Sequence, residues 1–221
     1  MMSILDFDKI FAYSIYMEAI VYKCPNCGAN VSKEHRNCDY CESPVTIKSF
    51  KEVREMPLPL VNKYIRSYTD QIGIDGKPLA FSLGMCQLKL KLYDKAFASF
   101  EKAMDDEMGN ADAYFYAVVA LLKGGKAFLL LRDDADKAVE YLNAACSIDD
   151  TKSIYWWLHG YIKEDFFERK FLRAEPKSQA CYQTAFEMAT EDEDAITTVT
   201  FLFDLLGVEF PKALKSFFEI N

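Results

Sequence analysis

Two pairs of cysteines near the N-terminus constrain this chain more than any other feature. Two residues separate Cys24 from Cys27, two separate Cys38 from Cys41, and ten lie between the pairs. A C-x2-C turn directs two thiolates at one centre, so two such turns supply the four soft ligands of a tetrahedral zinc ion. The spacing therefore predicts one structural Zn2+ held by Cys24, Cys27, Cys38 and Cys41.

Other uses of these cysteines fit the sequence less well. A disulfide framework is typical of secreted chains, and it would leave three of the seven cysteines over. A redox site needs a single C-x-x-C in a βαβ setting. Four thiolates leave no open coordination position for a catalytic water, so we expect a structural metal. His35 lies between the pairs, where a solvated turn histidine is favoured over a ligand.

The residues around the two pairs predict a small β unit. Residues 18–23 are typical of a strand before the first turn, and residues 44–48 of a strand after the second. Gly28 directly follows the first pair and suits the positive φ that closes such a turn. Over about residues 18–50 the pattern resembles a short zinc ribbon, a unit too small to fold without its metal.

The segment upstream of the ribbon has two interpretations. Met17-Glu18 stands directly before the first predicted strand, which makes residues 1–16 an N-terminal appendage. Phe7, Phe11 and Tyr13 would share one face of a short amphipathic helix there. The alternative is that translation begins at Met17. The segment lacks the basic start and small-residue cleavage site of a signal peptide, so we expect a cytoplasmic protein.

Composition and charge disfavour several classes of protein. Hydrophobic residues make up 51% of the chain and charged residues 27%, which excludes a disordered chain and predicts a sizeable core. No run of about 18 apolar residues exists, so we expect no membrane span. The net charge of −8 provides no field that collects nucleic acid, and residues 17–58 carry six basic and six acidic side chains. A nucleic-acid-associated factor that binds through its ribbon is therefore the alternative function.

The spacing of the apolar residues changes at Met56-Pro57. Downstream, strand signals disappear and apolar residues recur every three or four positions, as in helices that bury one face. We therefore assign residues 17–56 to the zinc ribbon and residues 57–221 to a helical domain. Residues 60–72 predict its first helix, which should end at Gly73.

A repeated pattern follows in the helical domain. Residues 77–110 carry Gly84 and Ala96, which let two helices approach closely, and Phe100, which fills the space between repeats. This spacing resembles the tetratricopeptide (TPR) repeat, a helical hairpin of about 34 residues. Less regular copies follow from Tyr114, Ser153 and residue 194.

The fold class implied by this resemblance is mainly α. We expect a TPR-like α-solenoid of three to four helical hairpins behind a small N-terminal β zinc ribbon. The register of the third hairpin stays open, because Ala180 and Cys181 both suit the small position of its second helix. An irregular helical bundle is the alternative.

TPR-like arrays curve, and the first helices of their repeats line a concave groove. In the register above, this lining is apolar and aromatic, which predicts docking of an amphipathic helix or peptide segment from a partner protein. The alternative is that the groove is filled from within, by residues 1–16 or by the helix at 60–72. The expected groove residues are Phe81, Met85, Phe115, Val119, Trp157 and Tyr161.

A second candidate surface lies in the third hairpin. Basic residues alternate there with Phe166, Phe167 and Phe171, which suits an acidic or phosphorylated partner. The competing interpretation is a helix end with its phenylalanines inside and its charges in water. The basic residues of this patch are Lys163, Arg169, Lys170 and Arg173.

Familiar catalytic motifs are missing from the sequence. Gly124-Gly125-Lys126 lacks the upstream glycine spacing of a phosphate loop. His159 lies on a predicted helix, where we expect a hydrogen-bonded structural role. The sequence as a whole predicts a non-enzymatic adaptor that binds other proteins through its helical groove and its ribbon.

Overall fold

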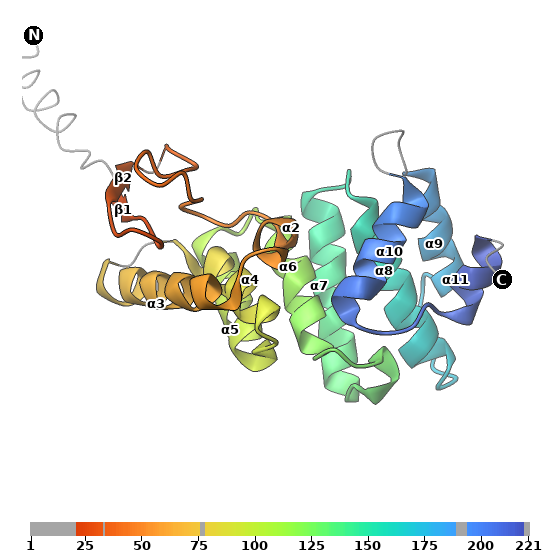
Figure 1. Cartoon of the computed structure of the whole chain (residues 1–221). Helices are drawn as coiled ribbons and strands as arrows, with labels where there is room; N and C mark the ends of the chain where they lie inside the picture. Colours follow the sequence, from red (N-terminus) through yellow and green to blue (C-terminus); the bar gives the residue numbers. More distant parts are fainter. Residues whose placement is uncertain (1–20, 33, 76–77, 189–193, 219–221) are drawn as a thin grey trace, which may run out of the picture. The chain divides into compact units, whose positions relative to one another are not determined.

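The computed structural model describes residues 21–32, 34–75, 78–188 and 194–218 (Figure 1). The chain divides into two compact units, Met1–Thr46 and Ile47–Asn221. The described residues are mainly helical, with one small two-stranded sheet in the first unit. The proposed appendage at residues 1–16 and the possible start at Met17 lie outside the described residues.

The division between the units precedes the predicted boundary at residues 56 and 57. Ile47 already belongs to the helical unit, because its N–H donates to Ser82 Oγ at 2.9 Å and its carbonyl accepts from that hydroxyl at 3.1 Å. The short helix α2 (Phe50–Arg54) follows and contacts α4, with Val53 fully buried. Residues 47–56 are therefore part of the helical unit.

A β-hairpin forms the described start of the first unit. Strand β1 (Val21–Lys23) pairs antiparallel with β2 (Asn30–Ser32), and the opposed Tyr22 and Val31 are both buried. The predicted strand at 44–48 is wrong: these residues form no strand, and Pro44 forms an isolated bridge with Asn37. The chain turns back directly after the first cysteine pair, so the partner of β1 lies between the two pairs.

The second unit is built from helices that follow one another closely in space. Each helix from α3 to α9 contacts the next one along the chain, and α10 contacts α8 (Figure 1). The predicted helix at 60–72 lies within α3, which continues past Gly73. The helices are α3 (Leu58–Asp75), α4 (Ala80–Lys89), α5 (Tyr93–Asp106), α6 (Ala111–Leu121), α7 (Arg132–Ile148), α8 (Ser153–Ile162), α9 (Ser178–Glu187), α10 (Ala195–Leu206) and α11 (Lys212–Phe217), with a 3-10 turn η1 (Ala127–Leu129) and a π-helical turn η2 (Lys163–Glu168).

Two glycines allow close contact between paired helices. A Cβ on Gly84 in α4 would lie 2.7 Å from Cε1 of Phe100 in α5, and one on Gly160 in α8 would lie 2.3 Å from Cε1 of Tyr182 in α9. Tyr182 thus takes in α9 the place that Phe100 takes in α5. Each ring therefore fills the space that a side chain on the glycine would need.

The correspondence between α5 and α9 extends to the residue one turn before each ring. Ala96 lies four residues before Phe100 and is fully buried; Ser178 lies four residues before Tyr182 and is 6% exposed. Ser178 in α9 therefore corresponds to Ala96 in α5. Ala180 is exposed, and Cys181 is buried at a different position of the helix.

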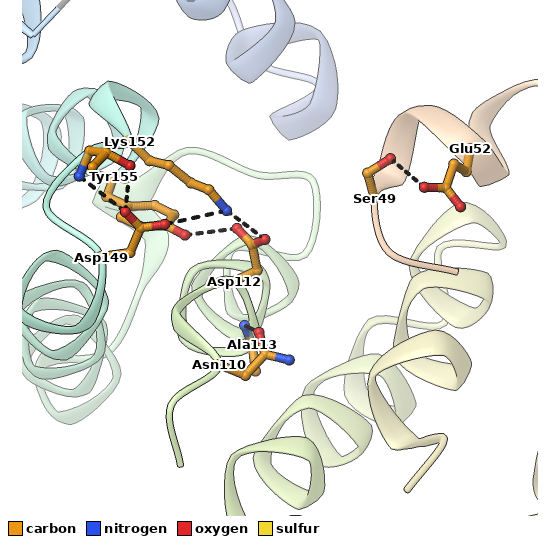
Figure 2. A network of polar contacts seen from close by, with 9 residues as sticks. Ser49, Glu52, Asn110, Asp112, Ala113, Asp149, Lys152 and Tyr155 are labelled. Carbon is orange, nitrogen blue, oxygen red and sulfur yellow. Dashed lines mark hydrogen bonds and ion pairs between the residues drawn. The ribbon is translucent and has the colours of Figure 1, made fainter. Parts of the chain in front are cut away.

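A polar cluster joins α6 to the start of α8 (Figure 2). Asp112 accepts hydrogen bonds from the Tyr155 hydroxyl and the Lys152 ammonium, both at 2.7 Å. Lys152 also lies 3.7 Å from a carboxylate oxygen of Asp149. The side chain of Asn110 accepts from the N–H of Ala113 at 3.2 Å and caps α6. These contacts hold the start of α8 against α6, although α7 lies between the two helices in the sequence.

We predict that the two close helix contacts tolerate no added methyl group. Gly84→Ala and Gly160→Ala should each lower the free energy of unfolding by about 1–3 kcal/mol, because the new Cβ meets an aromatic ring. Gly73→Ala is the matched control, since it lies on α3 with nothing within 4 Å of its Cβ position. It should raise stability by about 0.5–1 kcal/mol. Urea unfolding followed by circular dichroism measures all three; equal effects at Gly84 and Gly73 would contradict the packing described.

The helical unit also buries the ring of His159. His159 in α8 is 1% exposed, and neither ring nitrogen has a partner among the described residues. Its ring stacks on Trp156 at 5.8 Å between centroids. Burial, with a smaller contribution from the Lys163 ammonium, lowers the pKa of His159 to about 4. The expected burial of His159 is confirmed, and the hydrogen bond expected for its ring is not found among the described residues.

We predict an acid-dependent loss of stability from His159. Its pKa in the unfolded chain is near the ordinary 6.5, above the folded value, so the unfolded chain binds more protons below that pH. The contribution of neutral His159 to the free energy of unfolding is therefore fully present above pH 6.5. It is lost as the pH falls towards 4, and the total loss is about 3 kcal/mol. His159→Phe should flatten this dependence when urea titrations are repeated between about pH 7 and about pH 4. A pH dependence as steep in His159→Phe as in the wild type would contradict the assignment.

Candidate metal centre

The four paired cysteines converge on one point in the first unit. The sulfurs of Cys24 and Cys41 lie 3.6 Å apart, as do those of Cys27 and Cys38, and all four lie within 4.8 Å of one another. A tetrahedral ion with bonds of about 2.3 Å to sulfur separates its ligands by about 3.8 Å. A disulfide bond would need a distance of about 2.05 Å between two sulfurs. The geometry is therefore that of one four-thiolate metal site.

Two turns of the same shape present these sulfurs. In the first turn, the N–H of Gly28 donates to the carbonyl of Cys24 at 2.9 Å. In the second turn, the N–H of Glu42 donates to the carbonyl of Cys38 at 2.8 Å. Gly28 and Glu42 both have positive φ, 79° and 59°. Glycine adopts this conformation without strain, so the first turn gives a clear sequence signal. The second turn has Glu42 at the corresponding position, so its sequence gives no such signal.

Hydrogen bonds and burial act on the sulfurs in opposite directions. Hydrogen bonds from the backbone and the hydroxyl of Ser43 lower the pKa of Cys41 to about 6. Burial raises the pKa of Cys24 to about 12, although backbone N–H groups of Cys27 and Asn26 oppose it. Four such sulfurs hold their negative charge together only when a cation lies between them. The donor set therefore fits a soft divalent ion.

Residues around the sulfurs support their positions. The Asn26 amide donates to Ser43 Oγ at 2.9 Å and lies 3.9 Å from Cys41 Sγ, so it links the two turns. Cys24 and Cys38 are buried, whereas Cys27 is exposed. His35 lies 3.0 Å from Asp39 and half-exposed, so it pairs with a carboxylate. All four coordination positions belong to cysteine.

The expected groove residues lie in the core of the helical unit. Trp157 packs against Tyr182, Phe217 and Phe218, and Tyr161 against Phe203 of α10. The C-terminal segment therefore covers α8, an occupant that the sequence did not indicate. Phe81 is partly buried, and no more than 3% of any other member of the set is exposed: Met85, Phe115, Val119, Trp157 and Tyr161.

Three of the four basic residues of the predicted patch take part in internal contacts. Lys163 is 3% exposed and donates to the carbonyl of Glu175 at 3.2 Å. Arg169 and Lys170 lie over the ring of Phe128, at 4.1 and 4.8 Å from its centroid. Arg173 is exposed. The patch is therefore smaller than the sequence indicates.

The phenylalanines of this segment divide between the core and the surface. Phe166 and Phe167 are buried, as the competing interpretation requires, but Phe171 is 97% exposed. That interpretation is therefore right for two of the three rings.

Comparison with protein-family models finds no match for this chain, and comparison with curated proteins finds none either. Within the described part of the chain, the helices are too short or too polar to cross a membrane.

We predict that the metal stays only while the cluster is complete. Cys24→Ser and Cys38→Ser should each lower the metal content from about one ion per chain to near zero, because a hydroxyl is a poor ligand for a soft ion. Cys146→Ser is the matched control, since Cys146 lies in α7 outside the cluster. Elemental analysis of the purified variants measures this. An unchanged metal content in Cys38→Ser would contradict the four-thiolate site.

Proposed function

We propose that this protein is a non-enzymatic adaptor, in which a zinc ribbon and a TPR-like helical body serve one cytoplasmic protein assembly. The observation that carries the proposal is the closed four-sulfur site. Zn2+ is the ion that such a tetrahedral sulfur set favours among structural metals. With every ligand position taken by cysteine, the ion stabilises a folded surface and does not activate a substrate.

Repeated local geometry supports a TPR-like interpretation of the body. After α4, the N–H of Lys91 donates to the carbonyl of Leu88 and that of Leu92 to the carbonyl of Gln87. After η2, the N–H of Phe171 donates to the carbonyl of Glu168 and that of Leu172 to the carbonyl of Phe167, all at 2.8–3.0 Å. Both turns are Schellman caps with a left-handed residue, Lys91 or Phe171. The contacts of Gly84 and Gly160 with aromatic rings repeat in the same two hairpins. Hairpins of one design that stack on their neighbours are typical of scaffold proteins.

An exposed aromatic residue makes the ribbon the first docking module. Tyr40 lies between Cys38 and Cys41 and is 78% exposed. Its backbone is fixed by the metal-binding turn, so little conformational freedom is lost when a partner packs on the ring. The buried groove residues described above are not offered as a docking surface.

Co-purification from the native host, followed by reconstitution with purified components, tests the proposal. The wild-type chain should bind a defined partner protein directly, and Tyr40→Ser should weaken that binding at least about tenfold, or about 1.4 kcal/mol. Tyr40→Ser should keep its metal, because Tyr40 is not a ligand. Cys146→Ser is the control that should bind like the wild type.

Two results would contradict the adaptor. The first is a chain that binds no protein after reconstitution. The second is ribbon-dependent retardation of nucleic acid in a gel shift near physiological salt, which would favour the nucleic-acid-associated alternative.

A further inference from the structure

One of the four cysteines of the candidate metal centre is open to solvent. Cys27 is exposed, whereas Cys24 and Cys38 are only 2% and 1% exposed. Cys41 is partly buried, and the amide nitrogen of Asn26 lies 3.9 Å from its sulfur. An oxidant in solution therefore reaches Cys27 more easily than the other three cysteines.

The exposed cysteine has a close sulfur neighbour on the other turn. The sulfur of Cys27 in the first turn lies 3.6 Å from that of Cys38 in the second. An approach of about 1.5 Å would bring the two sulfurs to the length of a disulfide bond. Such a bond would cross-link the two turns, whereas a redox C-x-x-C motif forms its disulfide within one turn.

The cysteines outside the cluster compete poorly for an oxidant. They are Cys86 in α4, Cys146 in α7 and Cys181 in α9. Burial raises the pKa of Cys86 and Cys146 to about 12 and that of Cys181 to about 11. These three groups therefore stay protonated at neutral pH, whereas a cysteine that binds a metal is a thiolate, the form that peroxides oxidise.

We propose that Cys27 is an oxidation site, at which hydrogen peroxide converts the metal-bound ribbon into a disulfide-linked form. The Cys27 thiolate attacks one peroxide oxygen: an S–O bond forms, the O–O bond breaks, and the hydroxide that leaves is protonated to water. The Cys38 thiolate then attacks the Cys27 sulfur, an S–S bond replaces the S–O bond, and a second hydroxide leaves as water. The two sulfurs lose two electrons in all, and the peroxide gains them.

Release of the ion follows from this reaction. A sulfur in a disulfide has lost the negative charge that binds a soft ion, so two of the four ligands are removed. The new cross-link closes only the short loop between residues 27 and 38, which stabilises a chain far less than a structural zinc ion does. The inference goes beyond the proposed adaptor function and rests on the four-sulfur site alone.

Titration of the purified, zinc-loaded full-length chain with hydrogen peroxide tests the proposal. A chromogenic chelator measures the released zinc, and mass spectrometry of unreduced peptides maps the disulfide. About one ion per chain should be released as about two thiols are lost, with Cys27 linked to Cys38. Dithiothreitol with added zinc should restore the starting form. Cys146→Ser is the matched control and should release zinc at the wild-type rate, because Cys146 lies outside the cluster.

A second variant separates oxidation from loss of the metal site. Histidine is a common zinc ligand beside three cysteines, so Cys27→His should keep its ion. Because this variant lacks the exposed sulfur, release of zinc by peroxide should be slower by at least about tenfold. Should Cys27→His bind no zinc, the disulfide map of the wild type decides alone.

Each result either supports or overturns the oxidation site. A disulfide between Cys27 and Cys38 that forms as zinc is released supports it. A disulfide within one turn, oxidation confined to cysteines outside the cluster, or a chain that keeps its thiols and its ion overturns it. Release from Cys27→His at the wild-type rate also overturns it. A purified chain that lacks metal before the titration overturns the four-sulfur site itself, whereas a chain that binds no partner protein overturns only the adaptor.

Discussion

The convergence of four sulfurs on one point is the constraint on which the N-terminal unit depends. Its described core is small, with Tyr22, Val31 and Val45 as the main buried apolar side chains besides cysteine. Such a core cannot offset the conformational entropy of ordering the chain. The β-hairpin, the two cysteine turns and the Asn26 contact between the turns all serve to position the cysteine sulfurs. A metal ion bound by these sulfurs would therefore supply most of the folding free energy of the unit.

The helical unit depends on a different kind of contact. Its helices approach where glycine meets an aromatic ring, and polar groups such as Asp112 and Tyr155 then join helices that are not neighbours in sequence. Close packing also explains why the rings of Phe100 and Tyr182 are buried, since each fills a space left by a glycine.

What the sequence could reveal depended on how local each feature is. The four ligands follow from the spacing within two short turns, and the helical body follows from its periodicity. Strand β2 is only three residues long, too short for alternation to mark it, so the partner of β1 was assigned to the wrong segment. Burial of Trp157 depends on Phe217 and Phe218, sixty residues downstream, and no local pattern near Trp157 indicates which segment covers it. Ser178 was missed because serine is a less obvious small residue than alanine or cysteine.

X-ray absorption at the zinc edge of the purified protein tests the central claim most directly. The structure predicts a single ion surrounded by four sulfur atoms at about 2.3 Å, with no nitrogen or oxygen ligand. A mixed shell containing lighter atoms, or a folded N-terminal unit that contains no zinc, would contradict it.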